Sequence, residues 1–220
     1  MYTLVILGLS FCHNKKTIQN NSLESETVFN EPVKEFVNES ITATEFVRWC
    51  SDETNQLNKS KEISEVKYHL KYLPKESMAM LDLRTQKYDY NKFQSTCEYY
   101  TELTYFNFKI EIPQASGELL KYQLKSPQQY EDRIKYMSFE MQNDIYLVQG
   151  GDTLRPGLYQ FERIFEVAPF ATAMMAFDNK KFNKEKEFTI VFNDKLFDKG
   201  LIKFNYKNRQ LVNVPNIIGL

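Results

Sequence analysis

The second half of the chain is dominated by short segments rich in aromatic and aliphatic residues, each bounded by Gly, Asn, Asp or Pro. Such a pattern is typical of β-strands. The predicted strands are SFEMQ (138–142), DIYLVQ (144–149), LYQFERIFEV (158–167), ATAMMAFD (171–178), EFTIVFND (187–194), LIKFNYK (201–207) and QLVNV (210–214). No long helical pattern separates these segments, so we expect mainly antiparallel pairing. The sequence therefore predicts an α+β fold whose C-terminal half is a β-sandwich-like or strongly curved sheet.

Short helices are expected before this region. Thr42 and Glu45 have the spacing of a capping box, which predicts a helix over about 43–56. The segment VKYHLKY (66–72) alternates apolar and polar residues, as a half-buried strand does. Pro74 ends that strand and can open a second short helix.

Two further helices and one long strand complete the expected elements. Residues 89–100 fit a helix, and Ser126 followed by Pro127 marks the start of another. The segment between them, 102–112, is expected to be a strand that directs four apolar residues inward: Phe106, Phe108, Ile110 and Ile112.

The N-terminal segment indicates a membrane anchor. Residues 3–11 carry no charge, yet the run is too short to cross a bilayer and instead suits the apolar part of a signal peptide. Leu9-Ser10-Phe11-Cys12 resembles the lipobox of bacterial lipoproteins, in which the cysteine becomes the lipid-modified first residue. This interpretation divides the chain into a signal peptide (1–11), the lipidated Cys12 with a flexible tether (12–40), and one globular domain (41–220). The alternative is a soluble cytosolic protein in which 3–11 forms a strand.

Composition argues against a nucleic-acid partner. The chain has 28 Lys and Arg against 29 Asp and Glu, a net charge of −1, whereas a nucleic-acid-binding protein usually has a basic excess. After Cys12, two cysteines remain. Cys50 and Cys97 are a possible disulfide in an oxidising compartment, or two buried free thiols.

Residues suited to catalysis are sparse. His69 lies between two lysines on the polar side of its strand, where a carboxylate partner is not expected. No catalytic residue, metal site or cofactor is predicted. In the loop QGGDTLRPGLY (149–159), Asp152 and Arg155 offer opposite charges to a ligand. The competing interpretation of 150–157 is an eight-residue hairpin connection.

Two functional classes, an envelope hydrolase and a binding module, predict different arrangements of side chains. A carboxylate-dependent envelope hydrolase would bring two of Asp144, Asp152 and Glu162 together across a cleft. A binding module would instead expose an aromatic or apolar patch on the sheet or near 150–157. The run EYYTELTYFNF (98–108) could stack against carbohydrate, or form core on one face and ordinary surface on the other.

One recurring pattern supports the anchor. LNKSKEI (57–63) running into YHLKYLP (68–74) resembles a pattern of uncharacterised bacterial lipoproteins, as do the later segments 154–157, 159–162, 192–194 and 196–197. The resemblance implies no activity. The sequence thus predicts a lipid-anchored cell-envelope protein that is a structural, interaction or binding component, with a periplasm-facing orientation preferred over exposure on the cell surface. Its expected partners are the membrane and another envelope protein.

Overall fold

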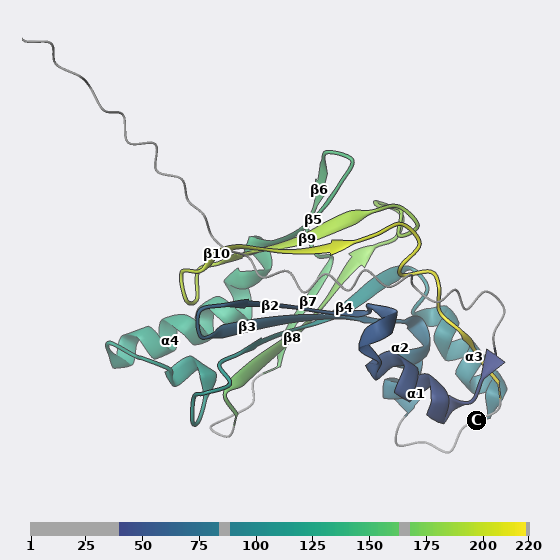
Figure 1. Cartoon of the computed structure of the whole chain (residues 1–220), viewed down its shortest axis with the longest axis horizontal. Coiled ribbons are helices and arrows are strands. Elements are labelled where there is room, and N and C mark those ends of the chain that lie inside the picture. Colours follow the sequence, from purple (N-terminus) through teal and green to yellow (C-terminus); the bar gives the residue numbers. More distant parts are fainter. Residues whose placement is uncertain (1–39, 84–88, 163–167, 219–220) are drawn as a thin grey trace, which may run out of the picture.

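Two antiparallel β-sheets face each other, with helices at both ends (Figure 1). The structure is a computed structural model that describes residues 40–83, 89–162 and 168–218. One sheet has the order β2 (Asn58–Ile63), β3 (Val66–Leu73), β4 (Leu103–Glu111), β8 (Phe170–Asp178) and β7 (Leu158–Glu162). The other has the order β10 (Gly200–Tyr206), β9 (Phe188–Asp194), β5 (Ile145–Gln149) and β6 (Asp152–Leu154). The α+β fold is confirmed, and the sandwich also draws on β2, β3 and β4 from the first half of the chain.

A short parallel pair joins the two ends of the described region. β1 (Ser40–Ile41) pairs with β11 (Asn216–Ile217). The Ile218 N–H donates to the Ile41 carbonyl at 2.9 Å, which extends the pair by one bond.

Three helices gather at one end of the sandwich and a fourth lies at the other (Figure 1). They are α1 (Ala43–Ser51), α2 (Lys75–Leu83), α3 (Tyr90–Tyr99) and α4 (Pro127–Lys135). The capping box of Thr42 and Glu45 is confirmed. The first helix is shorter than the predicted 43–56 because Asp52 is extended and caps a separate 3-10 turn, Glu53–Asn55.

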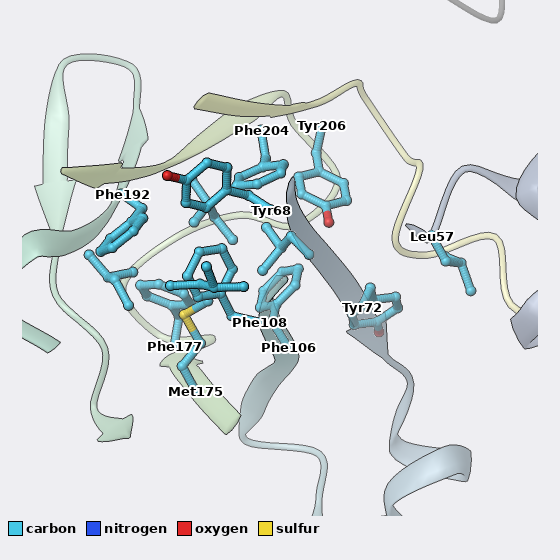
Figure 2. Packing of buried hydrophobic residues seen from close by; sticks show 14 of the residues in the cluster. Leu57, Tyr68, Tyr72, Phe106, Phe108, Met175, Phe177, Phe192, Phe204 and Tyr206 are labelled. Carbon is cyan, nitrogen blue, oxygen red and sulfur yellow. The ribbon is translucent and has the colours of Figure 1, made fainter. Parts of the chain in front are cut away.

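Aromatic rings from both sheets fill the core. The ring centroid of Phe108 lies 5.1 Å from that of Phe192 and 6.1 Å from that of Phe204, both across the sandwich. Phe106 meets Tyr206 at 5.7 Å in the same way (Figure 2). Every second residue of β3 is buried, as its alternation predicts. Burial of such rings is the main stabilising contribution available to this sandwich.

Two of the predicted strands are wrong. Residues 138–142 belong to a π-helix, η3 (Tyr136–Glu140), and a 3-10 helix, η4 (Met141–Asp144). Residues 210–212 lie in turns, and 213–214 have no regular secondary structure. Of the predicted strand 158–167, the first half is β7, and 163–167 lie outside the described residues.

β2 is an edge strand whose inward positions are lysines, so its sequence lacks the apolar alternation of a half-buried strand. Lys59 and Lys61 pair with the buried Leu70 and Tyr68 of β3, so the two lysines lie on the inner side of the sheet. The Lys59 amine sits 4.8 Å from the ring centroid of Tyr206 on β10, between the edges of the two sheets. Inward-pointing charges of this kind discourage an edge strand from pairing with another chain.

Candidate functional site

The outer face of the five-stranded sheet carries charged and polar side chains from neighbouring strands. A charged row runs across it, with His69 of β3 beside Lys109 of β4. His69 Nε2 lies 3.2 Å from Glu111 Oε2, close but not aligned for a hydrogen bond. Lys109 forms an ion pair with the same carboxylate oxygen. The expectation that His69 lacks a carboxylate partner is therefore wrong, because strand pairing supplies one from 42 positions away in sequence.

The charges of this row are set by mutual contact and burial. Partial burial, followed by the neighbouring Lys109, lowers the pKa of His69 below its usual value. The hydrogen bond from Lys109 is the main reason that the pKa of Glu111 is also lowered. At neutral pH the row therefore holds a neutral imidazole and an ionised carboxylate.

This row does not have the arrangement of a serine hydrolase. Ser60 is the cross-strand neighbour of His69. However, the Nε2 atom of His69 lies 3.2 Å from Glu111, and no hydrogen bond links the imidazole to Ser60, so the pair is not arranged for proton transfer from the serine. We interpret the row as a charged part of the sheet surface.

The helical end of the same face carries what we call the outer tyrosine cluster: Tyr99, Tyr100 and Tyr105. Tyr99 and Tyr100 meet edge to face, with centroids 5.1 Å apart and an interplanar angle of 88°. Tyr100 meets Tyr105 in the same manner at 5.6 Å and 77°. Tyr105 is buried, whereas the Tyr99 side chain is 78% exposed. The cluster thus leads from the sheet out to solvent.

Apolar residues support this cluster from beneath. Tyr105 packs with Met78 of α2 and Ala176 of β8 in a small hydrophobic cluster separate from the sandwich core. Strand register places Leu158 of β7 beside Ala176, and Leu158 is 37% exposed. An apolar band therefore crosses β3, β4, β8 and β7 at this end of the outer face.

Several buried polar groups elsewhere have structural partners. Asp194 is 2% exposed and accepts a hydrogen bond from the Tyr68 hydroxyl at 2.7 Å. Three backbone N–H groups of the β9–β10 turn also donate to its carboxylate: those of Leu196, Phe197 and Lys199. This carboxylate fixes the turn against the opposite sheet.

Arg133 and Asp144 join α4 and η4 to their surroundings. Arg133 is buried and donates to the carbonyls of Leu120 at 3.1 Å and Tyr122 at 2.6 Å. Asp144 accepts from the Tyr136 hydroxyl at 3.1 Å and pairs with Lys195 at 2.7 Å. Burial, followed by Asp144, raises the pKa of Tyr136, which keeps that hydroxyl protonated.

The three carboxylates considered for hydrolysis lie in different parts of the fold. Asp144 precedes β5, and Asp152 begins β6 at the far end of the β5–β6 hairpin. Glu162 lies on the other sheet, at the end of β7, and accepts from Thr172 at 3.0 Å. The structure does not bring these three side chains to one place.

The loop that contains Asp152 and Arg155 has a shape the sequence did not predict. Gly150 and Gly151 have φ values of 58° and 95°, so they make a tight two-residue turn and not an eight-residue connection. Arg155 turns back to donate to the carbonyls of Asn143 and Ile145. Its guanidinium thus fixes the connection from β6 to β7 against the start of β5, whereas Asp152 lies next to the hairpin turn.

Cys50 and Cys97 are free, buried thiols, which corresponds to the second of the two alternatives. Cys50 Sγ lies 3.4 Å from Ser77 Oγ. Burial raises the pKa of both, that of Cys97 to about 12, so neither is an ionised nucleophile at neutral pH. Cys12, the predicted signal peptide 1–11 and all but residue 40 of the predicted tether 12–40 lie outside the described residues.

Among residues 40–83, 89–162 and 168–218, no three His, Cys, Asp or Glu side chains are grouped to hold a metal ion. In the same ranges, no helix has the length and apolar character needed to cross a bilayer. The space between Phe108, Phe192 and Phe204 is lined only by apolar side chains and admits no water. Comparison with protein-family models, curated proteins and solved structures finds no match to this chain.

Proposed function

We propose that this chain is a lipid-anchored protein of the bacterial cell envelope whose folded domain is a binding component. The observation that carries the binding role is the outer tyrosine cluster, because Tyr99 at the end of α3 extends the aromatic contacts of Tyr100 and Tyr105 into solvent, and exposed aromatic or apolar patches mark interaction sites. A catalytic role has less support, because the candidate carboxylates lie in different parts of the fold, and two of them, Asp144 and Glu162, contact structural partners.

The anchor rests on the sequence around Cys12. An apolar run that ends at a cysteine and gives way to a polar segment is the arrangement of a lipoprotein signal and its tether. A diacylated or triacylated cysteine provides two or more chains, which is enough for stable membrane attachment. The tether would let the domain reach envelope partners on the periplasmic side.

The anchor is tested by intact mass and membrane fractionation in a bacterial host, with Cys12→Ala as the comparison. The expected wild-type product begins at Cys12, carries acyl mass and sediments with membranes, and the variant loses both. An unmodified chain that still begins at Met1 in both proteins would overturn the anchor and favour the cytosolic alternative.

The binding role is tested with isolated envelopes. Detergent-solubilised wild-type protein should sediment with envelope fragments, and Tyr99→Ala should sediment less. Phe139→Ala is the matched control, since Phe139 is another aromatic residue, 67% exposed, on η3. Equal sedimentation of all three proteins would remove the outer tyrosine cluster as the site.

A further inference from the structure

We propose that the outer tyrosine cluster binds an uncharged glycan chain, with the ring of Tyr99 stacked on a sugar. This inference rests on the proposed binding role of the domain and names the chemical class of its ligand. Three properties of the described residues favour it: the support of the ring, the polar groups around it and the charge balance of the face.

The ring of Tyr99 is exposed but held in place. Tyr100 contacts it edge to face at 5.1 Å, and Tyr105, which is buried, contacts Tyr100 at 5.6 Å. The buried Tyr105 therefore restricts the motion of Tyr100, and Tyr100 restricts the motion of Tyr99. Tyr105 itself is held in the small hydrophobic cluster on the sheet. A ring positioned before binding loses little conformational freedom when a ligand stacks on it.

Polar groups suited to sugar hydroxyls surround the rings. The Tyr100 hydroxyl donates to Asp82 Oδ2 at 3.2 Å, and Asp82 is exposed. Burial, followed by the Asp82 charge, raises the pKa of Tyr100 to about 12, so this hydroxyl keeps its proton. The next cross-strand row adds an amine and two amides to the same face: Lys71, Asn107 and Gln160.

The charge of the face matches an uncharged ligand. By strand register, the outward residues include three lysines and four carboxylates: Lys67, Lys71, Lys109, Glu62, Glu111, Glu162 and Asp178. His69 adds no charge at neutral pH, because its pKa is lowered. A strongly anionic polymer would need a basic excess, which these residues do not provide. Sugars instead combine an apolar C–H face with hydroxyls, and this surface offers aromatic rings beside amides and a carboxylate.

A panel of immobilised oligosaccharides tests the proposal with the full-length acylated protein in detergent. The panel holds uncharged oligomers of glucose, N-acetylglucosamine, galactose and mannose, and sulfated and uronic-acid oligomers for comparison. At least one uncharged oligomer should bind. Binding should weaken about tenfold in Tyr99→Ala, the loss expected for one stacked ring. Phe139→Ala should bind as the wild type does, because this exposed ring lies outside the outer tyrosine cluster.

Several results would overturn the proposal. They are no binding to any uncharged oligomer, binding to charged oligomers alone, or equal binding by wild type and Tyr99→Ala. Protease treatment of the envelope fragments distinguishes failure of the glycan proposal from failure of the proposed binding role. If the panel is blank but envelope sedimentation needs Tyr99 and is lost after protease treatment, the ligand is a protein and the binding role remains. If sedimentation also fails, both proposals fail.

Discussion

The inner and outer faces of the five-stranded sheet are made by alternate residues of the same strands, yet they are built differently. On β4, Phe106 and Phe108 enter a core in which each ring meets rings of the opposite sheet. Their outward neighbours are polar: Asn107 is the cross-strand neighbour of Lys71, and Lys109 forms an ion pair with Glu111. Packing thus constrains the residues of the inner face more strongly than those of the outer face. Substitutions on the two faces should therefore separate stability from binding.

Removal of an inner ring should give the largest effect. Phe108→Ala takes away a fully buried side chain at the centre of the sandwich and leaves a cavity. We expect a loss of about 3–5 kcal/mol in the free energy of unfolding, measured by urea denaturation. Lys109→Ala, one residue along on the outer face, should cost less than about 1 kcal/mol, since it removes only a partly exposed ion pair. Similar losses in both variants would show that the faces do not differ as described.

Two buried tyrosines allow a finer test within the core. Tyr68→Phe removes a hydrogen bond to the buried Asp194 carboxylate, so we expect a loss of about 1–3 kcal/mol in unfolding free energy. Tyr206→Phe is the matched control, because the Tyr206 hydroxyl is buried and has no hydrogen-bond partner among the described residues. That second change should be neutral or stabilising. A larger loss for Tyr206→Phe than for Tyr68→Phe would contradict this description of the core.

The stability of the protein should depend on pH through Lys59 of the edge strand β2. Burial, followed by Lys207 and Lys61, lowers the pKa of Lys59 from 10.5 to about 8. Between these two values the unfolded chain binds more protons than the folded one, so the folded state gains stability as pH rises through this range. At pH 7 both states hold the proton, and the folded state carries the full cost of the charge. Lys59→Met should therefore stabilise the protein at pH 7.

For this partly exposed side chain we expect a gain of about 1–2 kcal/mol in Lys59→Met, and a flatter dependence of unfolding free energy on pH between 8 and 10. Urea denaturation at pH 7, 8.5 and 9.5 measures both. Lys203→Met, at an exposed position of β10, should leave the slope as it is in the wild type. An unchanged slope in Lys59→Met would mean that its amine is not desolvated.

The smallest effect on stability is expected at the proposed binding site. Tyr99 is 78% exposed, so Tyr99→Ala should change the free energy of unfolding by no more than about 0.5 kcal/mol. Thermal and urea unfolding check this. A loss above about 2 kcal/mol would make Tyr99 a structural residue and would complicate any binding defect of the same variant.

The strands with clean alternation could be predicted from sequence because their periodicity reflects one buried face. β3 and β4 follow this rule, and the capping residues of α1 and α4 also mark their helices correctly. β2 was not predicted because its inward positions are lysines. Residues 138–142 suggested a strand because Phe139 and Met141 alternate with polar residues. In the structure, Met137 and Met141 are buried four residues apart on helical turns, and Phe139 is exposed.

The candidate site depends on strand order, which periodicity does not contain. His69 and Glu111 meet because β3 pairs with β4, and Leu158 joins the apolar band because β7 pairs with β8. The outer tyrosine cluster lies within the aromatic run 98–108, whose two interpretations the sequence left open. The turn between α3 and β4 folds Tyr99 and Tyr100 back over Tyr105. No local pattern predicts that contact.

The parallel pair of β1 and β11 has a mechanical consequence if the chain is tethered at Cys12. Tension on the tether reaches the folded domain first at Ser40, where only two residues of each strand are paired. Such a short strand pair should separate under a smaller force than the longer strand pairs of the sandwich. Opening of this pair would add a few residues to the tether, while the two sheets of the sandwich stay folded.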